Sequence, residues 1–197
     1  FKSKPYPYIL IDEALPWDYY NMLNSEFPKF DKIIGKDEYK ENFAYRLNAI
    51  KTLKDDDISK EWKEFVNYHT SFEFLNDFYS IFLKSINNIY PNSAGKLPSK
   101  NNIGIRFDGQ HYFNLDCQFV INTPTSGETS VIEPHLDNPK EFYAALLYMK
   151  DEQDNSSGGN LTTHSFKDKP SFYGKSRVRG EKVNLIEEIE YKENRLV

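Results

Sequence analysis

The chain has 197 residues, of which 39% are hydrophobic and 16% aromatic, so it can bury a core, and an intrinsically disordered protein is excluded. Its formal net charge of −5 argues against general affinity for nucleic acid or for an anionic membrane surface. No stretch has the length of a membrane span, and we expect a cytoplasmic protein. The single cysteine, Cys117, can form no internal disulfide, and its apolar neighbours predict a buried thiol.

The first half of the chain is predicted to hold the helices. In chain order we expect a strand over residues 6–12, a helix over 15–27, a polar loop over 29–42, a short strand over 43–50 and helices starting near 58 and 71. Tyr20, Leu23 and Phe27 fall on one face of the first helix. The acidic run 55–57 precedes the next helical pattern, where carboxylates stabilise the positive end of a helix. A second metal site is the alternative for this run.

The second half is predicted to consist of short strands. The candidates are residues 103–107, 116–122, 142–149, 159–166, 183–191 and 195–197. Residues 91–101 are rich in Pro, Ser, Asn and Gly, and they mark the joint between the two halves rather than a domain boundary. Short strands separated by turns favour a β-sandwich or a jelly roll. The expected fold class is therefore mostly β with flanking helices, an α+β arrangement.

A histidine and an aspartate, His135 and Asp137, stand two residues apart in the run EPHLDNP (133–139). On an extended backbone both side chains point to the same face, so an imidazole nitrogen and a carboxylate oxygen can reach one ion. With a second histidine they would form the two-histidine, one-carboxylate facial site that suits Fe(II). The alternative is a surface histidine beside a turn-forming Asp-Asn-Pro.

Two further motifs follow this pair. The apolar run FYAALLYM (142–149) predicts a buried strand, and the pair Gly158-Gly159 enters the next strand ahead of Leu161. This order resembles the metal-binding half of the 2-oxoglutarate and Fe(II)-dependent dioxygenases, most closely their prolyl-hydroxylase-like branch. The resemblance covers roughly residues 115–197. A strand followed by a helix at the N-terminus is similar to the entry of the same branch.

The resemblance implies a double-stranded β-helix, a jelly-roll form, with the N-terminal helices packed on its major sheet. It implies one dioxygenase-like domain over residues 1–197. The family's distal histidine follows a motif like residues 194–197, as does the basic residue that pairs with 2-oxoglutarate. We therefore expect the third metal ligand beyond Val197, in a chain truncated before that histidine.

The resemblance also assigns roles to single residues. His135 and Asp137 would be two of the three iron ligands, and Tyr148 would donate its hydroxyl to the distal carboxylate of 2-oxoglutarate. Leu161 would line the cosubstrate pocket, and Asn138 would hold the turn after the aspartate. A core tyrosine at the barrel rim is the alternative for Tyr148.

Other residues could replace the missing partners. His164 is the only later histidine, but it lies too early for the family's distal ligand, and a wall-lining or buried role is the alternative. Arg106, Arg177 and Arg179 are substitutes for the basic residue, although solvated loop charges fit the last two as well.

The implied function is an Fe(II)- and 2-oxoglutarate-dependent dioxygenase that uses O2 to hydroxylate a small molecule, a sugar or a peptidyl proline. Succinate and CO2 would be released. One alternative is an inactive jelly-roll binding module, and another is a cupin-type metalloenzyme that does not use 2-oxoglutarate. Substrate identity and oligomeric state have no readable code in the sequence.

Overall fold

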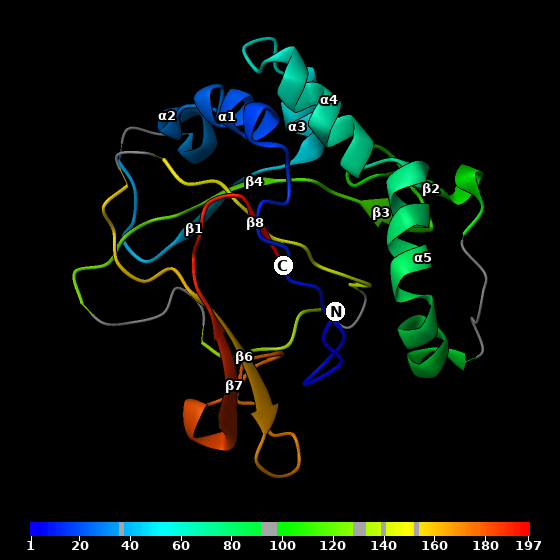
Figure 1. Ribbon diagram of the computed structural model, residues 1–197, viewed down its shortest axis with the longest axis vertical. Coiled ribbons are helices and arrows are strands. Elements are labelled where there is room, and N and C mark those ends of the chain that lie inside the picture. The colour runs from blue at the N-terminus through cyan, green and yellow to red at the C-terminus, as the bar shows by residue number, and fades with distance from the viewer. Residues whose placement is uncertain (36–37, 92–97, 128–132, 139–140, 152–153) are drawn as a thin grey trace. The chain divides into compact units, whose positions relative to one another are not determined.

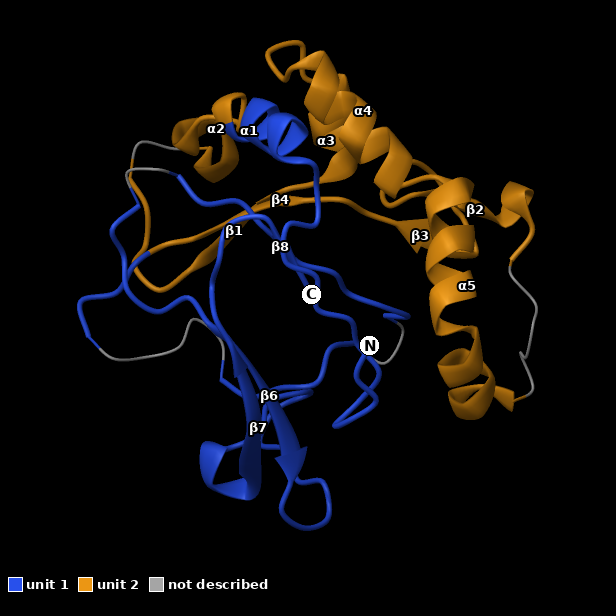
Figure 2. Ribbon diagram, viewed as in Figure 1, with its two compact units in different colours: residues 1–24, 124–197 blue, residues 25–123 orange. Residues whose placement is uncertain are grey.

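The structure is a computed structural model that describes residues 1–35, 38–91, 98–127, 133–138, 141–151 and 154–197 (Figure 1). Helices and small sheets are mixed in an α+β arrangement. The chain divides into two compact units: unit 1 comprises residues 1–24 and 124–197, and unit 2 comprises residues 25–123 (Figure 2). The predicted metal-binding pair lies in unit 1.

Unit 2 carries most of the helices. They are α2 (Phe30–Ile34), α3 (Ala49–Lys54), α4 (Lys60–His69) and α5 (Phe72–Ile89). Asn48, Ser59 and Ser71 cap the last three, because each side chain accepts a hydrogen bond from a backbone N–H in the first turn. A 3₁₀ turn, η2 (Lys100–Asn102), leads into the strands.

The strands of unit 2 form two pairs. β1 (Ala44–Leu47) is antiparallel to β4 (Phe119–Asn122), and β2 (Ile103–Ile105) is parallel to β3 (Phe113–Leu115). Three aromatic rings meet edge to face where α4 packs on β4. The ring centroid of Trp62 lies 4.7 Å from that of Phe119 and 5.8 Å from that of Phe27. This contact joins the helices of unit 2 to its β1–β4 pair.

The described α-helix of unit 1 is α1 (Trp17–Ser25), whose last residue belongs to unit 2, and the remaining elements of unit 1 are strands and one 3₁₀ turn. β5 (Leu147–Tyr148) pairs with β8 (Arg195–Leu196), and β6 (Leu161–Phe166) pairs with β7 (Val183–Ile189) around a bulge at Thr163 and His164. A 3₁₀ turn, η3 (Gly180–Lys182), leads into β7. Figure 1 shows β6 and β7 as a two-stranded arm.

Asn194 ties the two ends of unit 1 together. Its side chain is fully buried, and it accepts a hydrogen bond from Leu15 N at 2.9 Å and donates one to Leu15 O at 2.8 Å. Its backbone N–H donates to Tyr148 O at 3.0 Å, and its carbonyl accepts from Ala14 N at 2.9 Å. Asn194 also has a φ of 54°, a left-handed conformation that asparagine tolerates better than most residues.

Several expected elements differ from the structure. Residues 6–12 form no continuous strand but only isolated bridges at Tyr8 and Ile11. The predicted loop 29–42 contains α2, and the strand predicted over 142–149 is reduced to β5 (Leu147–Tyr148), which Leu146 extends by two backbone hydrogen bonds with Val197. A strand needs a partner ladder, and residue pattern alone does not supply one.

The acidic run 55–57 does not start a helix. Asp55 follows the end of α3, and α4 starts only after Ser59. The ammonium of Lys32 lies 2.8 Å from the carboxylate of Asp55 and 2.7 Å from that of Asp57, so this cation holds the run in place.

The described strands form four two-stranded sheets and close no barrel. The double-stranded β-helix therefore stays a prediction, as does the packing of the helices on its major sheet. Among the helices that the structure describes, none combines the length and the apolar character needed to cross a bilayer.

Candidate functional site

A short antiparallel pairing positions the predicted metal ligands. His135 forms a bridge with Arg177, flanked by hydrogen bonds from Leu136 N to Ser176 O at 2.9 Å and from Val178 N to Pro134 O at 2.8 Å. This pattern places His135 and Arg177 in a non-hydrogen-bonded pair, whose side chains share one face at close range. Val178 is 2% exposed, so its buried side chain anchors the pairing in unit 1.

The structure brings His135 and Asp137 together. The imidazole Nε2 lies 3.5 Å from the carboxylate Oδ1. The side chain of His135 is 34% exposed and that of Asp137 59% exposed, so an ion can reach both atoms from solvent. The prediction that the two side chains share a face is confirmed by this distance.

A backbone contact fixes the tautomer of the His135 imidazole. Nδ1 of His135 lies 2.9 Å from the carbonyl oxygen of Glu133, and because a carbonyl only accepts, Nδ1 donates. In the neutral ring Nε2 then presents a lone pair toward the Asp137 carboxylate. One metal ion can bind both of these electron-rich atoms, which lie 3.5 Å apart.

No third ligand accompanies the pair in the described residues, because they hold no group of three His, Cys, Asp or Glu side chains arranged to bind a metal. His164 lies in β6 opposite Leu185, where burial lowers the pKa of its imidazole. Of the three ligands that the resemblance predicts, the described residues thus offer two candidates, His135 and Asp137.

Tyr6 approaches the pair from the N-terminal segment. Burial raises the pKa of its phenol, and the negative charge of Asp137 raises it further. Tyr6 and Asp137 lie far apart in the sequence, so no local pattern signals this neighbour.

Tyr148 lies at a separate backbone pairing. It stands opposite Arg195 in the β5–β8 ladder, and burial raises the pKa of its phenol although the guanidinium opposes that shift. Arg195 is itself occupied, because its Nε lies 2.6 Å from Asp12 Oδ1 and its Nη1 2.8 Å from Glu190 O. The phenol of Tyr148 is therefore a neutral donor at ordinary pH, as its predicted role requires.

Tyr191 connects Tyr148 to the glycine pair, a role that the sequence did not indicate. Its ring centroid lies 5.2 Å from that of Tyr148, and its hydroxyl donates to Met149 O at 3.0 Å. Gly159 has a φ of 76°, and a Cβ built there would lie 3.2 Å from Cδ1 of Tyr191. The predicted turn thus requires glycine for its backbone and for this ring, and Leu161 follows it as the first residue of β6.

Of the three candidate arginines, Arg106 lies in unit 2, and Arg177 and Arg179 lie close together in unit 1. The guanidinium of Arg106 stacks on Phe107 at 4.8 Å. Arg177 is the backbone partner of His135, and Arg179 lies two residues further on. Cys117 is only partly buried in unit 2, and burial raises the pKa of its thiol to about 12, which agrees with the predicted unreactive thiol.

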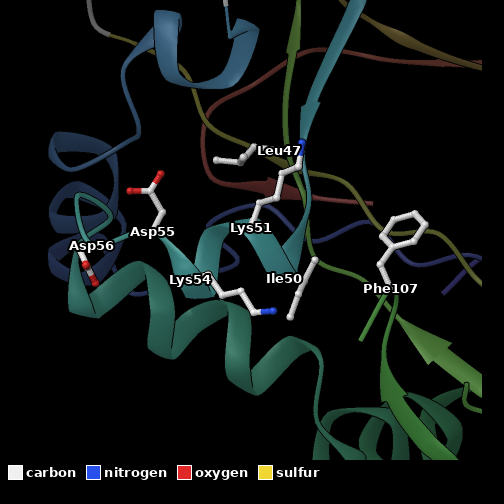
Figure 3. Close-up of a pocket in the computed structure, with 7 residues that line it drawn as sticks. All are labelled: Leu47, Ile50, Lys51, Lys54, Asp55, Asp56 and Phe107. Carbon is white, nitrogen blue, oxygen red and sulfur yellow. The ribbon is translucent and has the colours of Figure 1, made fainter. Parts of the chain in front are cut away.

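Unit 2 has a cavity of its own, which is shown in Figure 3. It is lined by Leu47, Ile50, Lys51, Lys54, Asp55, Asp56 and Phe107. Its charges are of both signs, and it contains none of the residues His135, Asp137, Tyr148 and Leu161 that the resemblance assigns to the site. Asp55 and Asp56 of the acidic run line it, but the described residues hold no group of three side chains arranged to bind a metal. We therefore place the candidate site at His135 and Asp137.

Comparison of the chain with models of protein families, with curated proteins and with solved structures gives no significant match.

Proposed function

We propose that His135 and Asp137 bind Fe(II) and that the protein is a 2-oxoglutarate-dependent dioxygenase. The observation that carries the proposal is the 3.5 Å approach of His135 Nε2 to Asp137 Oδ1, with Nδ1 engaged by a backbone carbonyl. The substrate class is a small molecule, a sugar or a peptidyl proline. The double-stranded β-helix belongs to the same proposal.

The donor set fits a divalent metal of this kind. Two ligands that each lie ~2.1 Å from one ion are about 3.0–3.4 Å apart, so the observed separation needs only a small adjustment. A histidine whose second nitrogen donates to a backbone carbonyl is the arrangement that orients metal ligands. Imidazole and carboxylate together suit Fe(II), which would couple the oxidative decarboxylation of 2-oxoglutarate to substrate hydroxylation.

The residues around the pair have distinct tasks in this proposal. The Glu133 carbonyl holds His135 in the tautomer whose Nε2 can bind a cation. Tyr148 keeps its proton, because burial raises its pKa, and can donate to the carboxylate of 2-oxoglutarate. Tyr191 and Gly159 fix the turn that leads into Leu161.

Turnover tests the proposal directly. Fe(II)-dependent formation of succinate from 2-oxoglutarate should be lost in His135→Ala and in Asp137→Ala, while both variants stay folded. His111→Ala is the matched control, because His111 is a partly buried histidine of unit 2 whose Nε2 lies 3.0 Å from Asp108 O. Full activity in either ligand variant would refute the metal assignment.

Tyr148→Phe tests the cosubstrate contact. Removal of the hydroxyl should raise the concentration of 2-oxoglutarate needed for half-maximal turnover by about tenfold, the effect of one lost hydrogen bond to a charged group. Tyr112→Phe is the control, since Tyr112 is 87% exposed. An unchanged requirement in Tyr148→Phe would remove this residue from the site.

A metal-free binding module is the second candidate, favoured by the lack of a third ligand in the described residues. It predicts that neither Fe(II) nor Mn(II) binds the pair. A cupin-type metalloenzyme would bind the metal without releasing succinate. Metal binding and succinate release, measured on the same sample, separate all three.

A further inference from the structure

The segment between β6 and β7 has a charge opposite to that of the whole chain. Residues 167–182 contain six basic side chains against two acidic ones, a net charge of +4 in a chain whose net charge is −5. The basic residues are Lys167, Lys169, Lys175, Arg177, Arg179 and Lys182. A local excess of one sign attracts ligands of the other sign.

A cavity of about 240 Å³ lies within this segment, lined by Ser171, Phe172, Tyr173, Arg179 and Lys182. Both aromatic rings of the lining contact other side chains. The Phe172 ring meets that of Phe166 edge to face at 5.8 Å, and the guanidinium of Arg179 lies 5.9 Å from the centre of the Tyr173 ring. The cavity is a surface hollow whose exposed lining combines two aromatic rings, a hydroxyl and two cations, groups that can contact a small organic anion.

The two cations are available to a ligand. Arg179 lies 4.0 Å from Glu181, and both side chains are about two-thirds exposed, so this ion pair is weak. For Lys182, the described residues offer no ion pair. A guanidinium and an ammonium that line one cavity recognise a carboxylate or a phosphate.

The cavity is close to the proposed metal pair along the chain. Arg179 is two residues from Arg177, the bridge partner of His135. Two residues of extended chain span about 7 Å. With about 4.5 Å more between the Cα atoms of the non-hydrogen-bonded pair, the Cα of Arg179 lies within about 12 Å of that of His135, a distance that an extended small molecule can span.

We propose that this cavity binds the anionic group, a carboxylate or a phosphate, of a small-molecule substrate whose apolar part lies against Phe172 and Tyr173. The inference rests on the proposed function and narrows its substrate class to small organic anions. It places the group to be hydroxylated toward His135 and Asp137, with the charged end at Arg179 and Lys182.

Phenyl phosphate is a suitable probe, because it joins an anion to a flat apolar ring. Titrated into the 197-residue chain and followed by amide chemical shifts, it should perturb residues 171–182 and saturate. Arg179→Ala and Lys182→Ala should each raise its dissociation constant about fivefold, and the double variant more. Lys175→Ala is the control, as this exposed lysine of the same segment does not line the cavity. Benzyl alcohol, which lacks the charge, should bind far more weakly.

Two variants test the anion site and the metal site independently. His135→Ala should leave phenyl phosphate binding unchanged, and Arg179→Ala should leave metal binding unchanged. Lack of saturable binding, equal binding of benzyl alcohol, or an effect of Arg179→Ala no larger than that of Lys175→Ala would overturn the inference. Displacement of phenyl phosphate by 2-oxoglutarate would overturn it too, because the cavity would then be a cosubstrate site. Failure of the metal to bind would refute the proposed function alone.

Discussion

Replacement of Asn194 by alanine should destabilise the protein more than any surface substitution. The asparagine is fully buried, and its amide makes both side-chain hydrogen bonds to the backbone of Leu15, at 2.8 and 2.9 Å. Alanine leaves that N–H and that C=O without partners, at a cost of about 1 kcal/mol each. It must also adopt the left-handed backbone, φ 54°, which costs about 1 kcal/mol more.

The expected loss for Asn194→Ala is thus about 3 kcal/mol, equivalent to a fall in melting temperature of roughly 6–12 °C for a chain of this size. Asn194→Gly loses the same hydrogen bonds but tolerates the backbone, so it should cost about 2 kcal/mol. The difference between the two variants isolates the backbone strain.

Urea unfolding followed by circular dichroism measures these free energies. Asn184→Ala, at an exposed position of β7, is the control and should lie within about 0.5 kcal/mol of the parent protein. A cost for Asn194→Ala no larger than that of the control would refute the role of Asn194 as a buried link. Equal costs for the alanine and glycine variants would refute the strain.

Two further predictions concern the glycine pair and the fall in unfolding free energy at low pH. Gly158→Ala should cost about 1 kcal/mol for its positive φ alone. Gly159→Ala should cost more, because its Cβ would lie 3.2 Å from Cδ1 of Tyr191 and the ring would have to shift. Equal losses in urea unfolding would refute the importance of that contact. The hydrogen bond from Arg195 lowers the pKa of Asp12 to about 2, so its stabilising effect is present above the unfolded pKa near 4 and is lost as the pH falls toward 2. Asp12→Asn should accordingly flatten the fall in unfolding free energy between about pH 4 and pH 2, and a fall as steep as in the parent protein would contradict it.

Helices with long apolar faces could be predicted from the sequence, whereas short helices could not. α4 and α5 follow from apolar residues at helical spacing. α3 lies partly in a run predicted as a strand, and it is held by the Asn48 cap and by a hydrogen bond from Ala49 N to Asp116 Oδ1 at 3.0 Å. That second partner comes from a distant part of the chain, and no local pattern reveals it.

In the candidate site, too, local features could be predicted from the sequence and long-range contacts could not. The approach of His135 and Asp137 follows from the two-residue period of an extended backbone, which is a local property. The partners that define the surroundings are not local: Arg177 pairs with His135 across many residues, and Tyr191 reaches Gly159 from another strand. Pairings of this kind depend on loop closure and packing, which a single sequence does not encode in readable form.

The pairing of His135 with Asp137 around a divalent ion is best tested by paramagnetic NMR. The chain has four histidines, so the imidazole carbon–proton spectrum holds four ring systems that can be followed separately. Substoichiometric Mn(II), a stable substitute for Fe(II), broadens the signals of a ligand ring even when binding is weak.

We predict that Mn(II) broadens the ring signals of His135 first, and that Asp137→Ala abolishes this effect. The partly buried His111, which lies in unit 2, should stay sharp at the same metal concentration. Equal broadening of His111 and His135, or broadening of His135 that persists in Asp137→Ala, would show that the two side chains do not form a metal site.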